Sequence, residues 1–259
     1  MTETTGDPLT FDRAASEYRE GRPPYPEEMF DFLGKLGALR SGSRVLEIGP
    51  GTGIATRQLI GRGASVVAVE VGETFADRLR VDFQRDDCVV LQQDASIFLP
   101  REGSFDAVVA ATSLHWIDRS ALPNLVRGLV PGGWFCAWWT VYHDPDIDTA
   151  FQAGVHDLYR RHLPDYQVDL RSGPRPLQVA DRADELAGAG LRDVRWKWFR
   201  WSTSLTGAQL RMLYSTFPAI ENRPAQTRER FLTDLVSLVG GDDASVEVHY
   251  VTALYAGRR

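Results

Sequence analysis

The sequence predicts an α/β fold in which a mostly parallel β-sheet is connected by crossover helices. Two observations support this prediction. Over the first 140 residues, short apolar runs of strand length alternate with stretches whose apolar residues recur at helical spacing. One of these runs also ends in a glycine-rich turn that is followed at once by a helical stretch, a pattern typical of a ligand-binding βα unit.

The composition is that of an ordinary globular chain. Of its 259 residues, 43% are hydrophobic and 25% are charged. The formal net charge is −6 and no basic run is long enough to follow a nucleic-acid backbone, so no nucleic-acid partner is expected. No apolar run approaches the roughly 18–20 residues that span a bilayer. The N-terminal residues lack the pattern of a secretory signal, so we expect a cytoplasmic protein with no membrane partner.

The first half of the chain contains five predicted strands with helices between them. The strands are residues 44–48, 65–70, 88–91, 105–110 and 134–139, and the helices are residues 52–61, 73–82 and 120–129. Residues 131–133, Pro-Gly-Gly, are expected to end the last of these helices and to turn the chain into the fifth strand.

The second half has a weaker pattern. Residues 141–180 carry helical periodicity only around 151–162, and we interpret them as a helical lid insertion rather than an independent domain. Further helices are predicted at 181–189, 205–217 and 227–239, and the last two strands, 194–202 and 246–255, as an antiparallel edge around two of these helices. The expected organisation is an N-terminal cap segment at 1–40 and a single domain at 41–259.

The sharpest signal is a glycine loop at the end of the first strand. Gly49, Gly51 and Gly53 stand at alternate positions in VLEIGPGTG, directly before a helix. Glycine is required where the backbone takes unusual dihedral angles or where a ligand approaches without meeting a Cβ. Because open α/β sheets bind ligands at the carboxyl ends of their strands, the loop is expected to contact a ligand.

The spacing of the glycines argues against two phosphate-binding loops. In a dinucleotide fingerprint the sixth position counted from Gly49 is glycine, and here it is Ile54. Glu47, two residues before the loop, adds a carboxylate that suits an ammonium group, or a ribose through water, and repels a phosphate. No Gly-Lys-Ser/Thr follows, so a P-loop is excluded. A nicotinamide-dependent oxidoreductase therefore remains only a third hypothesis.

Two acidic residues follow the next two strands. Glu70 ends the second strand about twenty residues beyond the loop, where a carboxylate accepts hydrogen bonds from both ribose hydroxyls. Asp94 follows the third strand, where its side chain would accept from an adenine amine while the N–H of Ala95 reaches a ring nitrogen. Taken alone, each acid is also compatible with a solvated turn. The pair in series with the glycine loop predicts an adenosine site.

These residues together resemble the class I S-adenosylmethionine-dependent methyltransferases, in the small-molecule branch that includes trans-aconitate methyltransferase. VLEIGPGTG resembles the family's first motif, VVAVE its acidic strand and QQDA its adenine loop, and the N-terminal FDRAASEYREGRPPYPEEM is similar to a segment that precedes the first motif. The resemblance covers about residues 11–140. It implies a Rossmann-like, seven-stranded sheet of order 3-2-1-4-5-7-6 with strand seven antiparallel.

The resemblance also implies a set of contacts with S-adenosyl-L-methionine. The implied cofactor-binding residues are Gly49, Gly51 and Gly53 at the methionine part, Glu70 at the ribose, Asp94 and Ala95 at the adenine, the backbone carbonyls of Ala111, Thr112 and Ser113 at the ammonium group, and Tyr18 and Arg22 in the leading segment. Glu47, beside the glycine loop, is counted with them as a cofactor-binding candidate. Arg22 would pair with the cofactor carboxylate, and a capping or surface arginine is the equal alternative. Tyr25 would face the reacting centre from the same segment.

Methyl transfer from a sulfonium needs alignment and exclusion of water, and a general base only where the acceptor is a hydroxyl. His115 follows the fourth strand and is the candidate base, with a packing histidine as the alternative. Trp116 is a candidate wall of the acceptor pocket or a core aromatic. Arginines in the insertion, Arg160, Arg161, Arg171 and Arg175, suit an anionic acceptor or are solvated charges. No metal is expected, because the histidines lack a ligand spacing.

The sequence thus predicts an enzyme that transfers a methyl group from S-adenosyl-L-methionine to a small-molecule acceptor, with O-, N- and C-methylation all open. The alternative is a cofactor-binding protein on the same fold that does not methylate, since no single residue marks methyl transfer. We expect a monomer or a homodimer.

Overall fold

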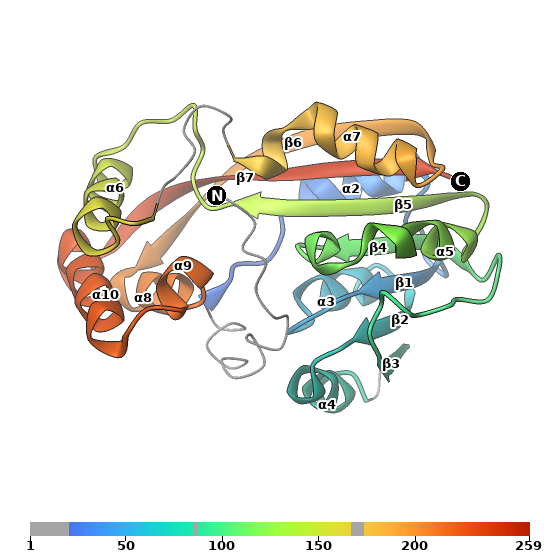
Figure 1. Cartoon of the computed structure of the whole chain (residues 1–259), viewed down its shortest axis with the longest axis horizontal. Coiled ribbons are helices and arrows are strands. Elements are labelled where there is room, and N and C mark those ends of the chain that lie inside the picture. Colours follow the sequence, from blue (N-terminus) through green and yellow to red (C-terminus); the bar gives the residue numbers. More distant parts are fainter. Residues whose placement is uncertain (1–20, 85–86, 167–173) are drawn as a thin grey trace.

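The computed structural model describes residues 21–84, 87–166 and 174–259. Its centre is a seven-stranded sheet of order β3-β2-β1-β4-β5-β7-β6, which confirms the predicted order (Figure 1). The strands are β1 (Arg44–Ile48), β2 (Ser65–Glu70), β3 (Cys88–Gln92), β4 (Phe105–Ala111), β5 (Leu129–Val141), β6 (Arg192–Thr206) and β7 (Ser245–Arg258). Strands β1 to β5 pair in parallel, and β7 runs antiparallel to both β5 and β6.

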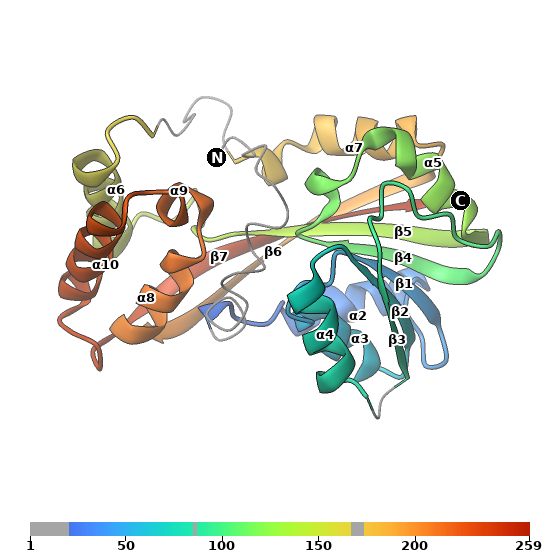
Figure 2. The same ribbon diagram turned by 60° about the horizontal axis from the view of Figure 1, so that its bottom comes forward.

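Helices cover both faces of the sheet. The α-helices within the described residues, including those that do not cover the sheet, are α2 (Glu27–Leu36), α3 (Ile54–Ile60), α4 (Glu73–Asp82), α5 (Leu122–Arg127), α6 (Ala150–His162), α7 (Val179–Gly188), α8 (Gly207–Ser215), α9 (Pro218–Glu221) and α10 (Ala225–Val239). Figure 2 shows α5 and α7 on one face and α2 and α3 on the other. Helix α2 lies within the expected cap segment. The Gly37 N–H, in a left-handed conformation, closes its last turn on the Gly34 carbonyl.

Each face has its own apolar core because side chains alternate along the strands. Leu46 and Ile48 of β1 pack with α5 and α7 residues such as Leu125 and Leu186. Val45, which points the other way, packs with residues of α2 and α3. The inner parallel strands, such as β1, are therefore apolar on both sides, which explains why the sequence shows them as continuous apolar runs rather than as alternating ones.

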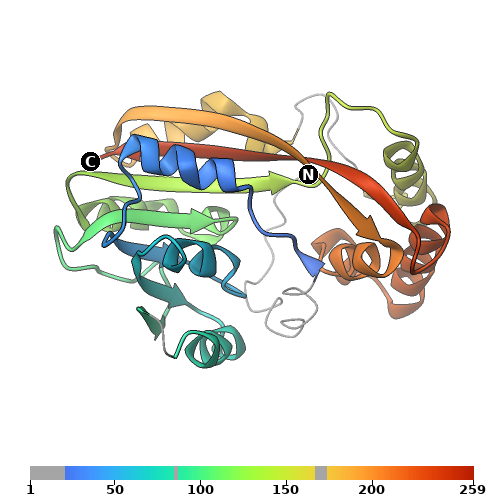
Figure 3. The ribbon, with the colours of Figure 1, turned by 180° about the vertical axis from the view of Figure 1, so that it is seen from behind.

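A helical lobe extends from one end of the sheet. We use this name for α6, α8, α9 and α10 together with the outer parts of β6 and β7 (Figure 3). The last pair between β5 and β7 is Val141 with Val251, whereas β6 and β7 stay paired as far as Thr206 with Ser245. The two long strands thus carry the sheet into the lobe. There a third apolar core joins residues of α6, α8 and α10, among them Leu158, Leu210 and Phe231.

One predicted boundary is wrong. Residues 131–133 do not end a helix, because α5 ends at Arg127 and β5 begins at Leu129. The pairing of β4 with β5 moves from Phe105 opposite Leu129 to Ala107 opposite Trp134, so the Pro-Gly-Gly segment forms an irregularity inside the strand. Gly132 takes a φ of 80° there, a conformation that favours glycine.

None of the helices within the described ranges has the length and apolar composition needed to cross a bilayer.

Candidate active site

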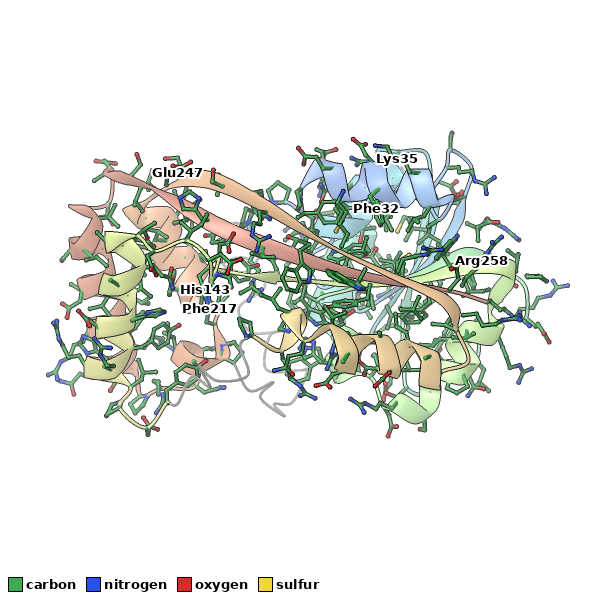
Figure 4. All side chains as sticks on the ribbon, turned by 90° about the horizontal axis from the view of Figure 1, so that it is seen from above. Phe32, Lys35, His143, Phe217, Glu247 and Arg258 are labelled. Atoms are coloured by element: carbon green, nitrogen blue, oxygen red, sulfur yellow. The ribbon has the colours of Figure 1, made fainter. Side chains whose placement is uncertain are left out.

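A cavity of about 690 Å³ lies at the carboxyl ends of the parallel strands, where the lobe meets the sheet. Its walls come from the loops after β1, β2, β3, β4 and β5 on one side and from α6, α8 and α9 on the other. In Figure 4 the labelled His143 and Phe217, both of which line the cavity, lie next to each other at the lobe end of the molecule. Small-molecule sites typically enclose about 300–1,000 Å³, so the volume is sufficient for a cofactor with an acceptor.

The glycine loop contributes two of its glycines to this cavity. Gly49 and Gly51 line it, and Gly51 has a φ of 56° with open space where a Cβ would stand. A side chain at Gly51 would therefore enter the cavity. Gly53 does not line it: a Cβ there would lie 2.7 Å from Cε2 of Phe83. Gly53 thus permits close packing of α3 on α4, a role that differs from the predicted contact with the methionine part.

Glu70 holds the glycine loop to the end of β2. Its Oε2 accepts a hydrogen bond from the Gly51 N–H at 2.9 Å, and its Oε1 accepts one from the Gly72 N–H at 2.9 Å. The residue is 5% exposed and lines the cavity. These two backbone donors fix the orientation of the carboxylate, and a carboxylate oxygen can accept more than one hydrogen bond.

Glu47 lies beneath the loop and does not line the cavity. Its side chain is 0% exposed, and its Oε2 accepts a hydrogen bond from the Thr56 hydroxyl at 2.7 Å. Among the described residues, its Oε1 is buried with no hydrogen-bond partner. Burial, together with the neighbouring charge of Glu70, raises the pKa of Glu47 to about 7 against the lowering effect of Thr56. The predicted contact with an ammonium group therefore requires a bridging water.

The adenine end predicted from the sequence is also part of the cavity wall. Asp94 and Ala95 both line the cavity. Asp94 is exposed, and its Oδ1 accepts a hydrogen bond from the Ser96 N–H at 2.8 Å, which fixes the turn after β3. Ala95 is buried in the core beneath this turn.

The end of β4 is strained. Thr112 has a φ of 59°, which is rare for a β-branched residue, and its N–H donates to the Trp138 carbonyl at 2.7 Å. Its hydroxyl shares a hydrogen bond of 3.1 Å with the Tyr25 hydroxyl. The Ser113 hydroxyl donates to the Ile48 carbonyl and so connects this turn to the glycine loop. Ala111, Thr112, Ser113 and Tyr25 line the cavity, and strain of this kind gathers at functional sites.

His115 lies in a short 3₁₀ turn, Leu114–Trp116, on the cavity wall. Its Nδ1 accepts a hydrogen bond from the indole N–H of Trp139 at 3.1 Å. Burial, followed by the charges of Arg182, Arg175 and Arg22, lowers the pKa of His115 to about 4. An indole is only a donor, so neutral His115 carries its proton on Nε2. In this tautomer the Nε2–H of His115 is a hydrogen-bond donor, and the role of His115 as a base stays a prediction.

Trp116, together with Arg22 of the leading segment, lines the cavity near His115. Trp116 lines the cavity, with its ring centroid 4.8 Å from that of His115. Arg22 also lines it, and its Nη1 donates to the Tyr142 hydroxyl at 3.2 Å while its Nε donates to the Thr216 hydroxyl at 3.3 Å. Arg22 therefore connects the leading segment to the lobe. Tyr18 and Arg171 lie outside the described residues.

Several lining residues had no signal in the sequence analysis. They are Tyr142, Gln152, Tyr159, Tyr214, Phe217 and Arg223, mostly from the lobe. His143 is among the lining residues too, and burial lowers its pKa to about 4, with the charge of His156 acting in the same direction. In the part of the chain that the structure describes, no three His, Cys, Asp or Glu side chains gather as a metal site.

Part of the chain is similar to known methyltransferases. Residues 46–137 match the model of a family described as a methyltransferase domain. This range runs from β1 into β5, so it contains the glycine loop, Glu70, Asp94 and His115. The chain has the Rossmann-like fold of class I methyltransferases, with its matched domain forming the parallel half of the sheet.

Two curated relatives extend this likeness. An uncharacterized methyltransferase of Mycobacterium tuberculosis is 39% identical over 126 residues, which cover 48% of this chain and 49% of that protein. An uncharacterized methyltransferase-like protein of Schizosaccharomyces pombe is 27% identical over 235 residues, covering 88% of this chain and 85% of that protein. The chain thus matches the mycobacterial relative over about half of that protein's length.

Solved structures share the fold at low identity. A protein of Anaeromyxobacter dehalogenans described as a type II methyltransferase has a TM-score of 0.68 at 21% identity, covering 92% of this chain and 97% of its own. Phosphoethanolamine N-methyltransferase 2 of Haemonchus contortus, solved with phosphomonomethylethanolamine and S-adenosylhomocysteine, has a TM-score of 0.56 at 15% identity, covering 96% and 57%. The cyclase SpnF has a TM-score of 0.52 at 17% identity, covering 92% and 83%.

Proposed function

We propose that this chain is an S-adenosyl-L-methionine-dependent methyltransferase acting on a small-molecule acceptor. The observation that carries the proposal is the glycine loop clamped by Glu70 at the mouth of the cavity, inside residues 46–137 that match a methyltransferase domain. Open space at the Gly51 Cβ position allows a ligand to approach the backbone closely. These features fit the cofactor.

The described residues divide the binding task along the cavity. Glu70 would hold the ribose, and Asp94 with the N–H of Ala95 would hold the adenine. The turn of Ala111, Thr112 and Ser113 would face the ammonium group, and Arg22 the carboxylate. When bound, the cofactor supplies an activated methyl group for in-line displacement. The chain's own part is to align the acceptor and to exclude water, which the lobe does by covering the sheet edge.

We further propose that the acceptor is a small molecule, because helices of the lobe form one wall of the cavity. A cavity of this volume lined by aromatic side chains fits a metabolite better than a polymer. The remaining expectations from the sequence are kept as proposals: a cytoplasmic monomer or homodimer without a nucleic-acid or membrane partner, organised as a cap segment at 1–40 and one domain at 41–259. The likeness to trans-aconitate methyltransferase likewise remains a prediction.

A second candidate is favoured by one structural neighbour. The cyclase SpnF shares this fold. The second candidate is therefore a protein that binds the cofactor without transferring its methyl group. The two candidates predict the same binding and differ in turnover.

The test is calorimetric titration of the purified chain with S-adenosylmethionine, S-adenosylhomocysteine and NADH. Micromolar binding of both adenosyl ligands, abolished in Gly51→Arg and weakened in Asp94→Ala, supports the site. Gly103→Arg is a matched control, because Gly103 also has a positive φ and open space around its Cβ position but lies outside the cavity. A folded chain that binds neither adenosyl ligand would refute the proposal. Binding without release of S-adenosylhomocysteine across an acceptor screen would favour the second candidate.

A further inference from the structure

Helix α7 carries an arginine at a position that faces the core. Arg182 lies four residues before Leu186, so the two share one face of the helix, and Leu186 is 1% exposed in the core between α7 and the sheet. The Arg182 side chain is itself only 3% exposed. An apolar residue at this position would avoid the cost of taking a guanidinium out of water, so packing alone does not account for the arginine.

An ion pair compensates the buried charge. Nη1 of Arg182 lies 2.9 Å from Oε2 of Glu185, whose side chain is 6% exposed. The other carboxylate oxygen of Glu185 lies 3.3 Å from Nε of Arg119, whose side chain is 68% exposed. Two cations therefore share one carboxylate, and the group as a whole stays positive. A buried pair of this kind is weak evidence for a stabilising role, because desolvation offsets the attraction between the charges.

The guanidinium lies against the ring that binds His115. Cζ of Arg182 is 5.3 Å from the centroid of the Trp139 ring, which is within the range of a cation–π contact. The indole N–H of Trp139 donates to Nδ1 of His115 at 3.1 Å. A cation beside the indole polarises its N–H and makes it a stronger donor. The charge, the indole and the imidazole thus form one chain of contacts that ends at the cavity wall, where His115 lies.

The same charge acts on the protonation of His115. After burial, Arg182 is the largest cause of the lowered pKa of His115, followed by Arg175 in the 3₁₀ turn before α7 and by Arg22 of the leading segment. Arg175 and Arg22 line the cavity, whereas Arg182 does not. Because Arg182 lies outside the cavity, the entry of a ligand leaves its charge in place.

We propose that Arg182 is a positioning residue of the cavity, which acts directly and through Trp139 to keep the His115 ring uncharged with Nδ1 as an acceptor. The purpose of this arrangement rests on the proposed function. S-adenosylmethionine carries a sulfonium and an ammonium cation, and an imidazolium on the cavity wall would add a third positive charge, which disfavours binding. Arg182 holds its own cation outside the cavity and thereby prevents one from forming on the wall.

The test is an NMR titration of the histidine rings in the cofactor-free chain. The chain has five histidines, and His115→Gln identifies the signals of His115. In the wild type the pKa of His115 is expected at about 4. In Arg182→Met, which keeps the length of the side chain and removes its charge, the pKa is expected to rise by about 1, a tenfold stronger proton affinity. Arg182→Lys keeps the charge and is expected to restore the low pKa.

A control separates this effect from the loss of the ion pair. Arg119→Met removes the exposed cation from the same carboxylate, and the pKa of His115 is expected to stay at the wild-type value. Arg182→Met/Glu185→Met guards against a variant that unfolds because Glu185 has lost its buried partner. The double variant is expected to be at least as stable as the wild type and to show the raised pKa.

Two results would overturn the inference. One is a wild-type pKa of His115 in both Arg182→Met and the double variant. The other is an Arg182→Lys chain that titrates like Arg182→Met, because the shape of the side chain rather than its charge would then matter. These titrations need no cofactor, so they are independent of the proposed function.

The purpose is tested by repeating the titration of Arg182→Met with ligands. S-adenosylmethionine has one positive charge more than S-adenosylhomocysteine, so the pKa of His115 is expected to be lower by about 0.5 in the complex with S-adenosylmethionine. Equal pKa values in the two complexes would overturn the stated purpose. Failure of both ligands to bind the wild-type chain would instead refute the proposed function and leave the effect of Arg182 on His115 as measured.

Discussion

The buried carboxyl group of Glu47 gives the strongest stability prediction. Its pKa is raised from 4.5 to about 7 because the side chain is fully buried beneath the glycine loop. The folded state therefore binds the proton more tightly than the unfolded state. The free energy of unfolding is highest below the unfolded pKa, falls as pH rises, and levels off above the folded pKa.

The size of this effect follows from the shift. A change of about 2.5 pKa units, the difference between 4.5 and about 7, corresponds to about 3 kcal/mol at about 1.4 kcal/mol per unit. Replacing Glu47 by Gln removes the titration and keeps an oxygen that accepts from Thr56. The amide leaves an unpaired N–H₂ group in the core, and the cost of that group is independent of pH. The pH dependence of stability is thus more informative than its absolute value.

The measurement is urea unfolding of the wild-type chain and Glu47→Gln between about pH 5 and pH 8.5, where most of the predicted difference develops. Wild-type minus variant stability is expected to fall by about 3 kcal/mol over this range. Glu28→Gln, at an exposed carboxylate on α2, controls for the loss of one charge and is expected to parallel the wild type. Parallel pH profiles for the wild type and Glu47→Gln would refute the assignment of a raised pKa.

Three further outcomes are expected. Gly53→Ala should destabilise the chain by about 1–3 kcal/mol more than Gly103→Ala. Both glycines have a positive φ, but only at Gly53 would the new Cβ also clash, at 2.7 Å from Phe83. Equal losses of stability in thermal unfolding would contradict this. Trp139→Phe should free Nδ1 of His115 and shift its ring proton between the two nitrogens, a change visible in ¹⁵N NMR; an unchanged spectrum would mean that the indole does not set the tautomer. The thiol of Cys136, whose pKa burial raises to about 12, should react with a thiol reagent at about pH 8 only after unfolding, while half-buried Cys88 reacts in the native chain; native labelling that persists in Cys88→Ser would disprove this.

The sequence predicts the parallel half of the sheet well because its signals are local. Residues 65–70 and 73–82 coincide with β2 and α4, since a buried parallel strand is a continuous apolar run and a helix repeats its apolar face. The end of β7 was not predicted. Ala256 and Gly257 have low strand propensity, but they pair with Cys136 and Phe135 of β5, and this tertiary pairing decides their conformation.

The site residues also divide into those that local patterns predict and those that only long-range contacts bring together. The glycine loop and Glu70 were predicted, and they meet through a hydrogen bond between residues only 19 positions apart. Tyr142 and Thr216 meet Arg22 across 120 and 194 positions, and no local pattern marks such contacts. Thr112 was named only as part of a backbone turn. Its strained φ is accompanied by a hydrogen bond that its N–H donates to the Trp138 carbonyl and by one between its hydroxyl and that of Tyr25, and neither partner is adjacent in the sequence.

The difference between residues predicted from local patterns and residues joined by long-range contacts bears on how acceptor specificity arises. By acceptor end we mean the side of the cavity formed by the lobe. The proposed cofactor end is built from backbone groups and from carboxylates that accept hydrogen bonds from backbone donors, so changes there alter the loop itself. The lobe side of the cavity is built from side chains of α6 and α8 and of the segment around α9, and these helices pack with α10 in the lobe's own core. A substitution such as Arg223→Gln therefore leaves the sheet and the glycine loop undisturbed. Acceptor preference is thus expected to change with few substitutions in the lobe, while cofactor affinity stays constant.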